Sequence, residues 1–158
     1  MISIFFLCAL CVIQHCYAFS GGAPDLMCDD MLPLHIVPPQ HNKHPYKISV
    51  NQTEIKAGEA VEIEIAGDKF KGLMMEVRRR KDATGKFLLD EEENDFKTIN
   101  CHRGKKNTLT HQNNANKKNK KIVWKSPNVP GKYTIYATIA KDGFVFWTKI
   151  PAAEITVE

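Results

Sequence analysis

The sequence predicts an all-β fold, an antiparallel sandwich of about seven to nine short strands. Apolar and polar residues alternate in several short segments, most clearly at Val61, Ile63 and Ile65, which alternate with glutamates. Turn residues separate these segments, and no window of the chain repeats apolar residues with the period of a helix. The chain has 158 residues, which suits one domain, since domains most often contain about 100–150 residues.

The elements are expected in the following order. Residues 19–45 contain many Pro and Gly residues and predict an irregular, extended lead-in. Strands are expected at residues 46–50, 61–65, 73–77, 86–89, 121–125, 133–139, 144–148 and 155–157. Asp142-Gly143 predicts a hairpin turn between two of them. The aromatic residues Trp124, Phe144, Phe146 and Trp147 are expected to anchor the core, with a ligand-stacking face as the alternative.

Residues 1–18 predict a secretory signal peptide rather than a strand or helix of the mature fold. They contain no Lys, Arg, Asp or Glu, and their apolar run from Ile2 to Ile13 is too short for a membrane helix of about 20 residues. Cleavage after Ala18 would leave a mature chain of residues 19–158. No second apolar stretch approaches the length of a membrane span, so we expect a secreted, extracellular protein.

Two cysteines remain after such a cleavage, Cys28 and Cys101. An even number of cysteines in an oxidising compartment predicts one disulfide, which here closes a loop of 73 residues (101 minus 28). Asn51-Gln52-Thr53 is an acceptor sequence for N-glycosylation and fits the same compartment.

Charge is distributed unevenly along the chain. Residues 97–141 hold eleven Lys or Arg and no Asp or Glu, so this stretch carries +11 and the rest of the chain −7, for a total of +4. The densest part, residues 104–121, is rich in Asn and poor in apolar residues, so we expect an exposed, mobile loop. The lysines expected there to bind anionic ligands are Lys105, Lys106, Lys117, Lys118, Lys120 and Lys121.

Two interpretations of these charges remain open. The lysines are solvated loop charges, partly neutralised by the acidic run at residues 90–95, or they form a patch that binds polyanions. For a secreted protein the candidate polyanions are phosphates of lipopolysaccharide, teichoic acids, sulfated glycans and anionic lipid headgroups. Nucleic acid is not expected as a partner, because aromatic residues are not interleaved with the lysines.

Catalytic and metal-binding patterns have little support, and we expect neither an enzyme nor a bound cofactor. His41-x-x-His44 is the one pair with ligand-like spacing, but no cysteine pair or nearby carboxylate completes a set. Residues 19–158 contain no Gly-x-Ser-x-Gly, no Cys-x-x-Cys and no glycine-rich phosphate loop.

Motifs spread over residues 22–147 resemble the reeler domain, the module found near the N-termini of reelin and F-spondin. In order they are Gly22-Ala-Pro24, Cys28, Met31-x-Pro33-x-His35, Pro45-Tyr46, Gly58-Glu59-x-Val61, Phe70-Lys71-Gly72, Gly85-x-Phe87, Cys101, Asn107-Thr-Leu-Thr-His111, Trp124-x-x-Pro127, Gly131, Ala137-Thr138 and Phe146-Trp147. Small single-domain insect proteins of the defense or noduler type are the most similar group. Residues 73–77 and the very basic loop depart from the family pattern.

The resemblance implies an immunoglobulin-like β-sandwich that is secreted into haemolymph. It also implies a role in innate immunity, with binding to microbial surfaces, antimicrobial activity or promotion of haemocyte nodulation. The family supplies no catalytic residues to carry over to this chain. We expect a monomer whose partners are microbial envelope polyanions or a haemocyte surface.

Two other functions stay open. One is an extracellular-matrix or adhesion module that binds sulfated glycans. The other is a small lipid carrier with an apolar cavity between its sheets, lined by Met74, Met75, Phe87 and Phe146.

Overall fold

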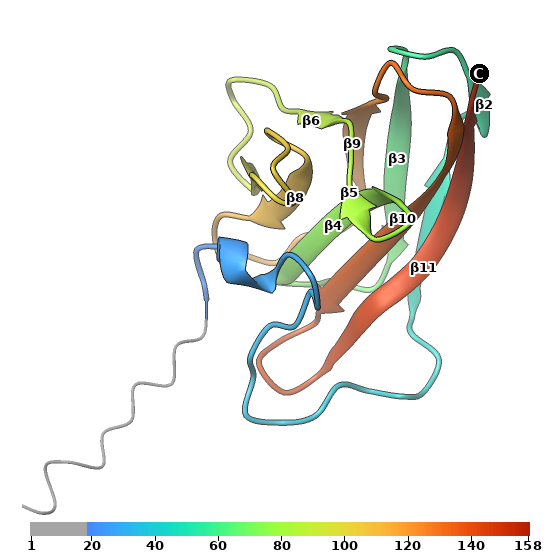
Figure 1. Ribbon diagram of the computed structural model, residues 1–158. Helices are drawn as coiled ribbons and strands as arrows, with labels where there is room; N and C mark the ends of the chain where they lie inside the picture. The colour runs from blue at the N-terminus through green and yellow to red at the C-terminus, as the bar shows by residue number, and fades with distance from the viewer. Residues whose placement is uncertain (1–18) are drawn as a thin grey trace, which may run out of the picture.

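The computed structural model describes residues 19–158, and its two β-sheets pack face to face as a sandwich (Figure 1). The predicted signal peptide lies outside the described residues. Nine of the described strands have three or more residues, and two more are two-residue pairings. The prediction of an all-β sandwich with about this many strands is therefore confirmed.

The smaller sheet has the order β1-β3-β9-β6, and all its pairings are antiparallel. It consists of β1 (Tyr46–Val50), β3 (Ala60–Gly67), β9 (Lys120–Lys125) and β6 (Lys86–Leu88).

The larger sheet has the order β2-β11-β10-β4-β8-β7, with one further short strand, β5, paired to β4. Its strands are β2 (Glu54–Ile55), β11 (Phe146–Val157), β10 (Gly131–Ala140), β4 (Gly72–Arg79), β8 (Thr108–His111), β7 (Phe96–Ile99) and β5 (Asp82–Ala83). Its pairings are antiparallel except between β2 and β11. The hairpin of β10 and β11 turns at the predicted Asp142-Gly143.

The inner core lies between the sheets and follows from the alternation of each strand. On β3 the inward residues Val61, Ile63 and Ile65 are buried, and the glutamates between them are not. Trp124 and Tyr133 are fully buried in the same cluster, with their rings 5.9 Å apart.

A second apolar cluster lies outside the sandwich, on the other face of the larger sheet. Here the N-terminal segment, which includes the 3₁₀ turn η2 (Asp25–Met27), runs across β4 and β10 (Figure 1). Met27 and Met31 of this segment pack with Met74 of β4 beside Cys101. We call residues 19–35, together with the sheet face beneath them, the outer layer.

Two expectations about local structure are wrong. Residues 104–121 are not one exposed loop, because they contain β8, whose residues Thr108, Leu109 and Thr110 are fully buried in the larger sheet. Phe144 is not part of the core but 65% exposed at the tip of the β10–β11 hairpin. Two N–H groups, of Phe144 and Val145, donate to Asp142 Oδ1, and this tight turn carries the Phe144 side chain outward.

Candidate functional site

The structure separates the six lysines that the sequence grouped together. Lys117 is only 1% exposed, and its ammonium donates to the carbonyl oxygens of Lys71, Asn113 and Ala115 at 2.9–3.1 Å. Burial lowers the pKa of Lys117, which Asp95 opposes. This side chain holds the chain around residues 113–117 in place and is not part of any surface, so the inclusion of Lys117 among the surface lysines is wrong.

Two more of these lysines form ion pairs within the protein. Lys120 Nζ lies 2.5 Å from a carboxylate oxygen of Asp95, and Lys121 Nζ lies 2.8 Å from one of Glu62. Partial burial of the Asp95 carboxyl is the largest single influence on its pKa and raises it. The hydrogen bond and charge of Lys120, together with Lys117 and Asn113, outweigh burial, so the pKa of Asp95 is lowered. Both lysines therefore have part of their charge neutralised locally.

Lys105 and Lys106 are exposed and form no ion pair with any residue that the structure describes. The Lys106 carbonyl accepts a hydrogen bond from the N–H of Phe87, which places these lysines beside β6. There Lys86 of β6 lies directly opposite Lys125 of β9. We call Lys86, Lys105, Lys106 and Lys125 the basic edge.

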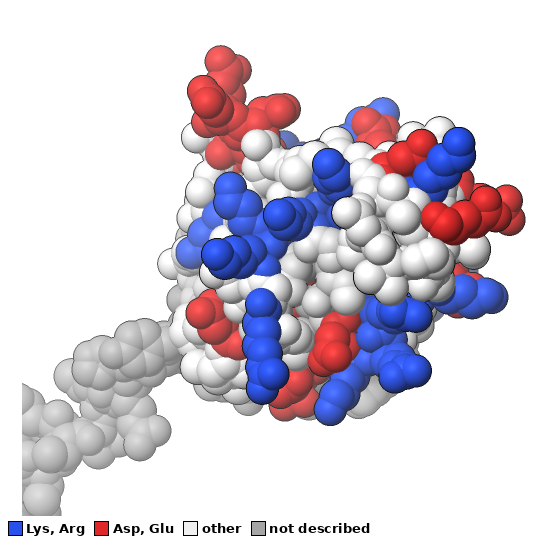
Figure 2. Space-filling model, turned by 45° about the horizontal axis from the view of Figure 1, so that its top comes forward, with Lys and Arg blue, Asp and Glu red and all other residues white. Residues whose placement is uncertain are grey.

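Like charges directly opposite each other on neighbouring strands are unfavourable for a sheet. The two side-chain charges of Lys86 and Lys125 are therefore unfavourable for the sheet, and they concentrate positive charge at the basic edge. Figure 2 shows Lys and Arg side chains over much of the face in view, whereas Asp and Glu side chains project from one corner and also lie at other places on the same face.

Lys118 belongs to the opposite end of β9. Its neighbour Lys117 pairs with Phe70, whereas the basic edge lies beside Trp124. β9 begins at Lys120, so Lys118 lies before its first residue, at the end of the strand remote from Trp124. The prediction had missed Lys86, because only the pairing of β6 with β9 brings it to this position.

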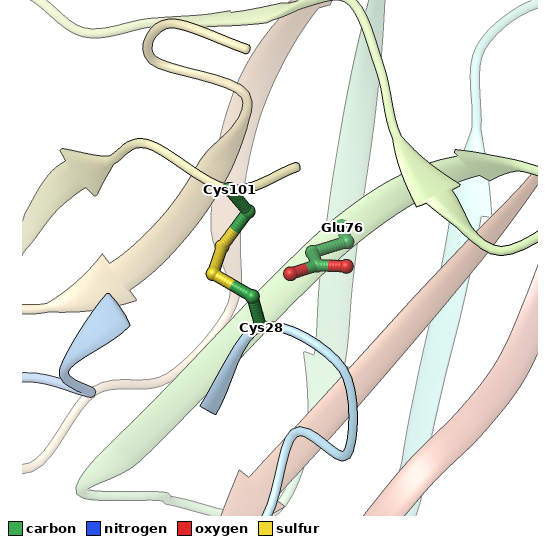
Figure 3. A group of neighbouring side chains, drawn as sticks. All are labelled: Cys28, Glu76 and Cys101. Carbon is green, nitrogen blue, oxygen red and sulfur yellow. A yellow bond between two sulfur atoms is a disulfide. The ribbon is translucent and has the colours of Figure 1, made fainter. Parts of the chain in front are cut away.

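The predicted disulfide is confirmed, and it fastens the outer layer to the sheet. Cys28 and Cys101 are bonded, with 5.5 Å between their Cα atoms. Glu76 of β4 lies beside the two sulfur atoms (Figure 3). These three side chains are close enough for a metal site, but both cysteine sulfurs are already used in the disulfide, so they offer no thiolate ligands.

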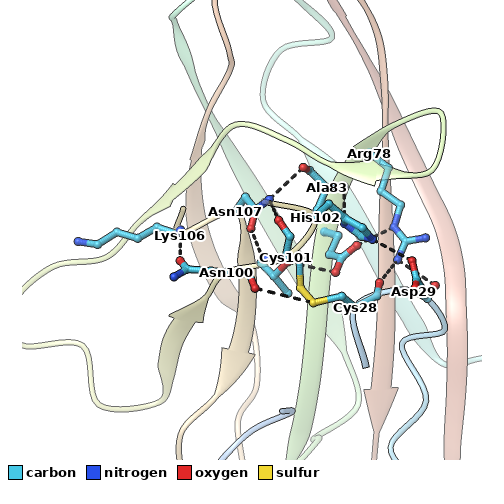
Figure 4. Close-up of a disulfide and its surroundings, with 11 residues drawn as sticks. Cys28, Asp29, Arg78, Ala83, Asn100, Cys101, His102, Lys106 and Asn107 are labelled. Atoms are coloured by element: carbon cyan, nitrogen blue, oxygen red, sulfur yellow. Dashed lines mark hydrogen bonds and ion pairs between the residues drawn. A yellow bond between two sulfur atoms is a disulfide. The ribbon is translucent and has the colours of Figure 1, made fainter. Parts of the chain in front are cut away.

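A buried ion pair completes this attachment, and Figure 4 shows its arginine, Arg78, beside Cys28 and Asp29. Arg78 Nε lies 2.6 Å from Glu76 Oε2, and both side chains are almost fully buried. The Arg78 guanidinium also donates to the carbonyl oxygens of Cys28 and Asp29. Burial raises the pKa of Glu76, an effect that Arg78 and the hydroxyl of Thr108 oppose. The pair thus positions the backbone next to the disulfide.

Asn51 is exposed directly after β1, as an N-glycosylation site requires. Its Oδ1 accepts a hydrogen bond from the N–H of Glu62, while no described residue is bonded to its Nδ2. The nitrogen that would carry a glycan therefore has no hydrogen-bond partner among the described residues.

The cavity expected for a lipid carrier is not where the sequence placed it. Met75 and Phe87 are buried in the inner core, and Phe146 is also buried. Of the four expected residues, only Met74 lines the apolar pocket of the outer layer.

No helix among residues 19–158 is long and apolar enough to cross a membrane. The histidine pair His41 and His44 is not part of any group of three metal-ligating side chains in the same residues.

The two packed sheets, the disulfide-tied N-terminal segment and the basic edge define an extracellular-type β-sandwich module. The reeler domain family matches residues 26–158, and the chain belongs to this family. Among its relatives is "Putative defense protein Hdd11" of Hyphantria cunea, 35% identical over 88% of this chain and 88% of that protein. "Putative defense protein" of Bombyx mori is 34% identical over 89% of this chain and 86% of its own length.

Two further comparisons show where else this module occurs. "Ferric-chelate reductase 1" of Mus musculus is 28% identical over 88% of this chain, but the match covers only 24% of that protein. The crystal structure of the human F-spondin reeler domain (fragment 1) superimposes with a TM-score of 0.63 at 12% identity, covering 79% of this chain and 97% of that one. The similarity to the F-spondin domain supports the β-sandwich fold of this chain.

Proposed function

We propose that this protein is a secreted defense protein that binds anionic components of microbial envelopes through its basic edge. Relatives that match over most of their length carry the name of defense proteins. The observation that carries the binding mechanism is the position of Lys86 opposite Lys125, next to the unpaired Lys105 and Lys106. Lipopolysaccharide and teichoic acid supply the phosphate groups that such a surface attracts.

The role that we propose in the animal follows from this binding. A protein that coats microbes in haemolymph promotes haemocyte nodulation or inhibits the microbe directly, and neither step requires catalysis. The basic edge consists of exposed lysine side chains, whose positive charges attract anions, so binding is the activity that its residues support.

The test is sedimentation of the purified protein with Gram-negative and Gram-positive bacteria at about 0.15 M and about 1 M salt. The Debye length falls from about 8 Å to about 3 Å between these conditions, so charge-driven binding is expected at the lower salt and lost at the higher. Binding that persists at high salt contradicts the proposed mechanism.

A pair of charge-reversal variants locates the surface. Lys86→Glu, Lys105→Glu, Lys106→Glu and Lys125→Glu together should abolish binding. The matched control changes the exposed Lys43, Lys47, Lys56 and Lys81 to Glu, which alters the net charge equally at other places. Equal losses in the two variants would show that net charge alone is responsible. Binding to heparin without binding to bacteria would favour the adhesion function.

A further inference from the structure

A pocket of about 250 Å³ opens in the outer layer, away from the basic edge. Its walls come from the N-terminal segment, the start of β4, the end of β8 with the residues just after it, and the end of β10 with the hairpin turn. Apolar side chains form most of the lining, among them Met27, Met31, Leu32, Met74 and Ala140. Its size is near the lower limit of small-molecule sites, which are about 300–1,000 Å³. It therefore fits one chain of a lipid rather than a whole lipid.

Exposed apolar side chains concentrate around this pocket. Among the described residues, eight large apolar side chains are exposed. Leu32 lines the pocket, and four others are the immediate neighbours in sequence of lining residues: Leu26, Leu34, Ile36 and Phe144. Ile36 is 77% and Phe144 is 65% exposed. Single exposed apolar residues are normal on a soluble protein, but a group of them marks an interaction site.

Two polar groups of the pocket lack partners among the residues that the structure describes. Nδ1 of His35 is buried without a hydrogen bond, although buried polar atoms are nearly always bonded. Lys71 lines the pocket with an exposed side chain that forms no ion pair. No ion pair joins Lys71 to the Asp142 carboxylate, which also lines the pocket and whose Oδ1 accepts from the N–H groups of Phe144 and Val145.

We propose that the outer-layer pocket binds one acyl chain of an anionic lipid. The chain lies along Met27, Met31 and Met74, whose flexible thioethers adapt to chains of different shape. The anionic head lies at Lys71, and a hydroxyl or carbonyl oxygen of the lipid bonds to Nδ1 of His35. The exposed rim then contacts the apolar layer from which the chain comes. This site uses none of the basic-edge residues and goes beyond the proposed function.

The first experiment measures binding of dodecanoate and of dodecanol, which share a chain and differ in charge, by displacement of a fluorescent polyene fatty acid. Dodecanoate is expected to bind more tightly than dodecanol, and Lys71→Glu should remove that difference. Ala140→Phe places a ring in the pocket and should abolish the binding of both. Absence of binding by the unaltered protein, or unchanged binding by Ala140→Phe, overturns the proposal.

Ala140 is 8% exposed, so Ala140→Phe needs a check on folding by its thermal unfolding. The variant Leu32→Ser avoids this difficulty, because Leu32 is 37% exposed at the pocket wall. It should weaken binding several-fold, whereas the matched control Leu88→Ser, on a 46% exposed residue of the other sheet, should not. Equal behaviour of the two variants contradicts the site.

A second arm distinguishes the source of the chain. Vesicles of phosphatidylcholine with phosphatidylglycerol should sediment the protein, and Ile36→Ser with Phe144→Ser should reduce this sedimentation. Binding of dodecanoate without binding of vesicles would assign free fatty acids as the ligand and retain the pocket. The basic-edge reversal variant should still bind dodecanoate, so failure of the microbial-binding proposal and failure of this one give different results.

Discussion

The inner core and the outer layer lie on opposite faces of the same sheet, and they are held together by different interactions. On β4, Leu73, Met75 and Val77 face the inner core, where the buried side chains are almost entirely apolar. Met74, Glu76 and Arg78 alternate with them and face the outer layer. Five of the eight buried polar residues of the described chain lie on that outer face: Glu76, Arg78, Thr108, Thr110 and Thr138.

These polar residues hold the N-terminal segment by directed bonds rather than by area alone. The Thr138 hydroxyl donates to the carbonyl oxygen of Met31 at 2.7 Å, and the Thr110 hydroxyl oxygen accepts from the N–H of Ala23 at 2.9 Å. Apolar packing is non-directional, but hydrogen bonds fix position. One face of the larger sheet therefore supplies stability, whereas the other face positions the N-terminal segment and leaves a pocket beneath it.

The largest effect is expected from truncating the inner core. Trp124→Ala removes a fully buried side chain and the hydrogen bond from its indole N–H to the Thr84 carbonyl. The expected loss is about 3–5 kcal/mol of unfolding free energy, a large share of the ~5–15 kcal/mol typical of a domain. Urea unfolding measures it. Val123→Ala, at the exposed neighbouring position, should change stability by no more than about 0.5 kcal/mol.

Removal of the disulfide tests whether the outer layer unfolds separately. Cys28→Ser with Cys101→Ser opens a loop of 73 residues, with an expected cost of about 2–4 kcal/mol. Hydrogen exchange should accelerate most at residues 23–31, while the amides of β3 and β10 retain most of their protection. Uniform acceleration across both faces would show that the two regions unfold as one unit.

A smaller effect is expected from a single polar bond of the outer layer. The Thr108 hydroxyl donates to Glu76 Oε1 at 3.1 Å, in a fully buried position. Thr108→Val keeps the shape but leaves the carboxylate short of one donor, at a cost of about 1–3 kcal/mol. The control is Thr156→Val on β11, where the side chain is only partly buried and no described residue bonds to the hydroxyl. A similar loss of unfolding free energy in both variants would show that the Thr108 hydroxyl does not help to hold the outer layer.

The inner core could be predicted because alternation is a local signal. Val61, Ile63 and Ile65 indicate their own burial, and so do Tyr133 and Ile135 on β10. The disulfide could be predicted because only two cysteines, Cys28 and Cys101, remain once residues 1–18 are set aside as a signal peptide. The strand β8 could not, because it carries Thr108 and Thr110 on its outer face and a single apolar residue, Leu109, on the other. Buried threonines look like loop residues until the segment that covers them is known.

The lysines of the candidate site also depend on contacts between residues that are distant in the sequence. Lys117 is buried because carbonyl groups from residues 71, 113 and 115 converge on its ammonium, and the contribution of Lys71 comes from 46 residues away. Lys86 joins Lys105 and Lys106 only through the pairing of β6 with β9. Sequence composition indicated the charge of the region, but which lysines share a surface depends on strand register.

The smallest effect, a pH dependence, separates the two regions without altering the core. Burial lowers the pKa of His35 below its ordinary 6.5, with Asp142 opposing and His111 adding to the effect. Burial also lowers the pKa of His111, against the bonds to the Leu73 and Phe19 carbonyls that raise it. Both residues line the outer-layer pocket, so protonation of either one changes the stability of the outer layer.

A folded-state pKa below the unfolded one means that the unfolded chain binds more protons between the two values. Stability that is complete above pH 6.5 is therefore lost as the pH falls through the folded-state pKa values. Urea midpoints from pH 7.5 to 5 should decrease, and His35→Phe with His111→Gln should reduce that slope. The difference between wild type and variant cancels other titrating groups such as Glu76. Because His41 is exposed, His41→Gln should keep the wild-type slope, and a slope that survives in the double variant would assign the pH dependence to groups outside the outer layer.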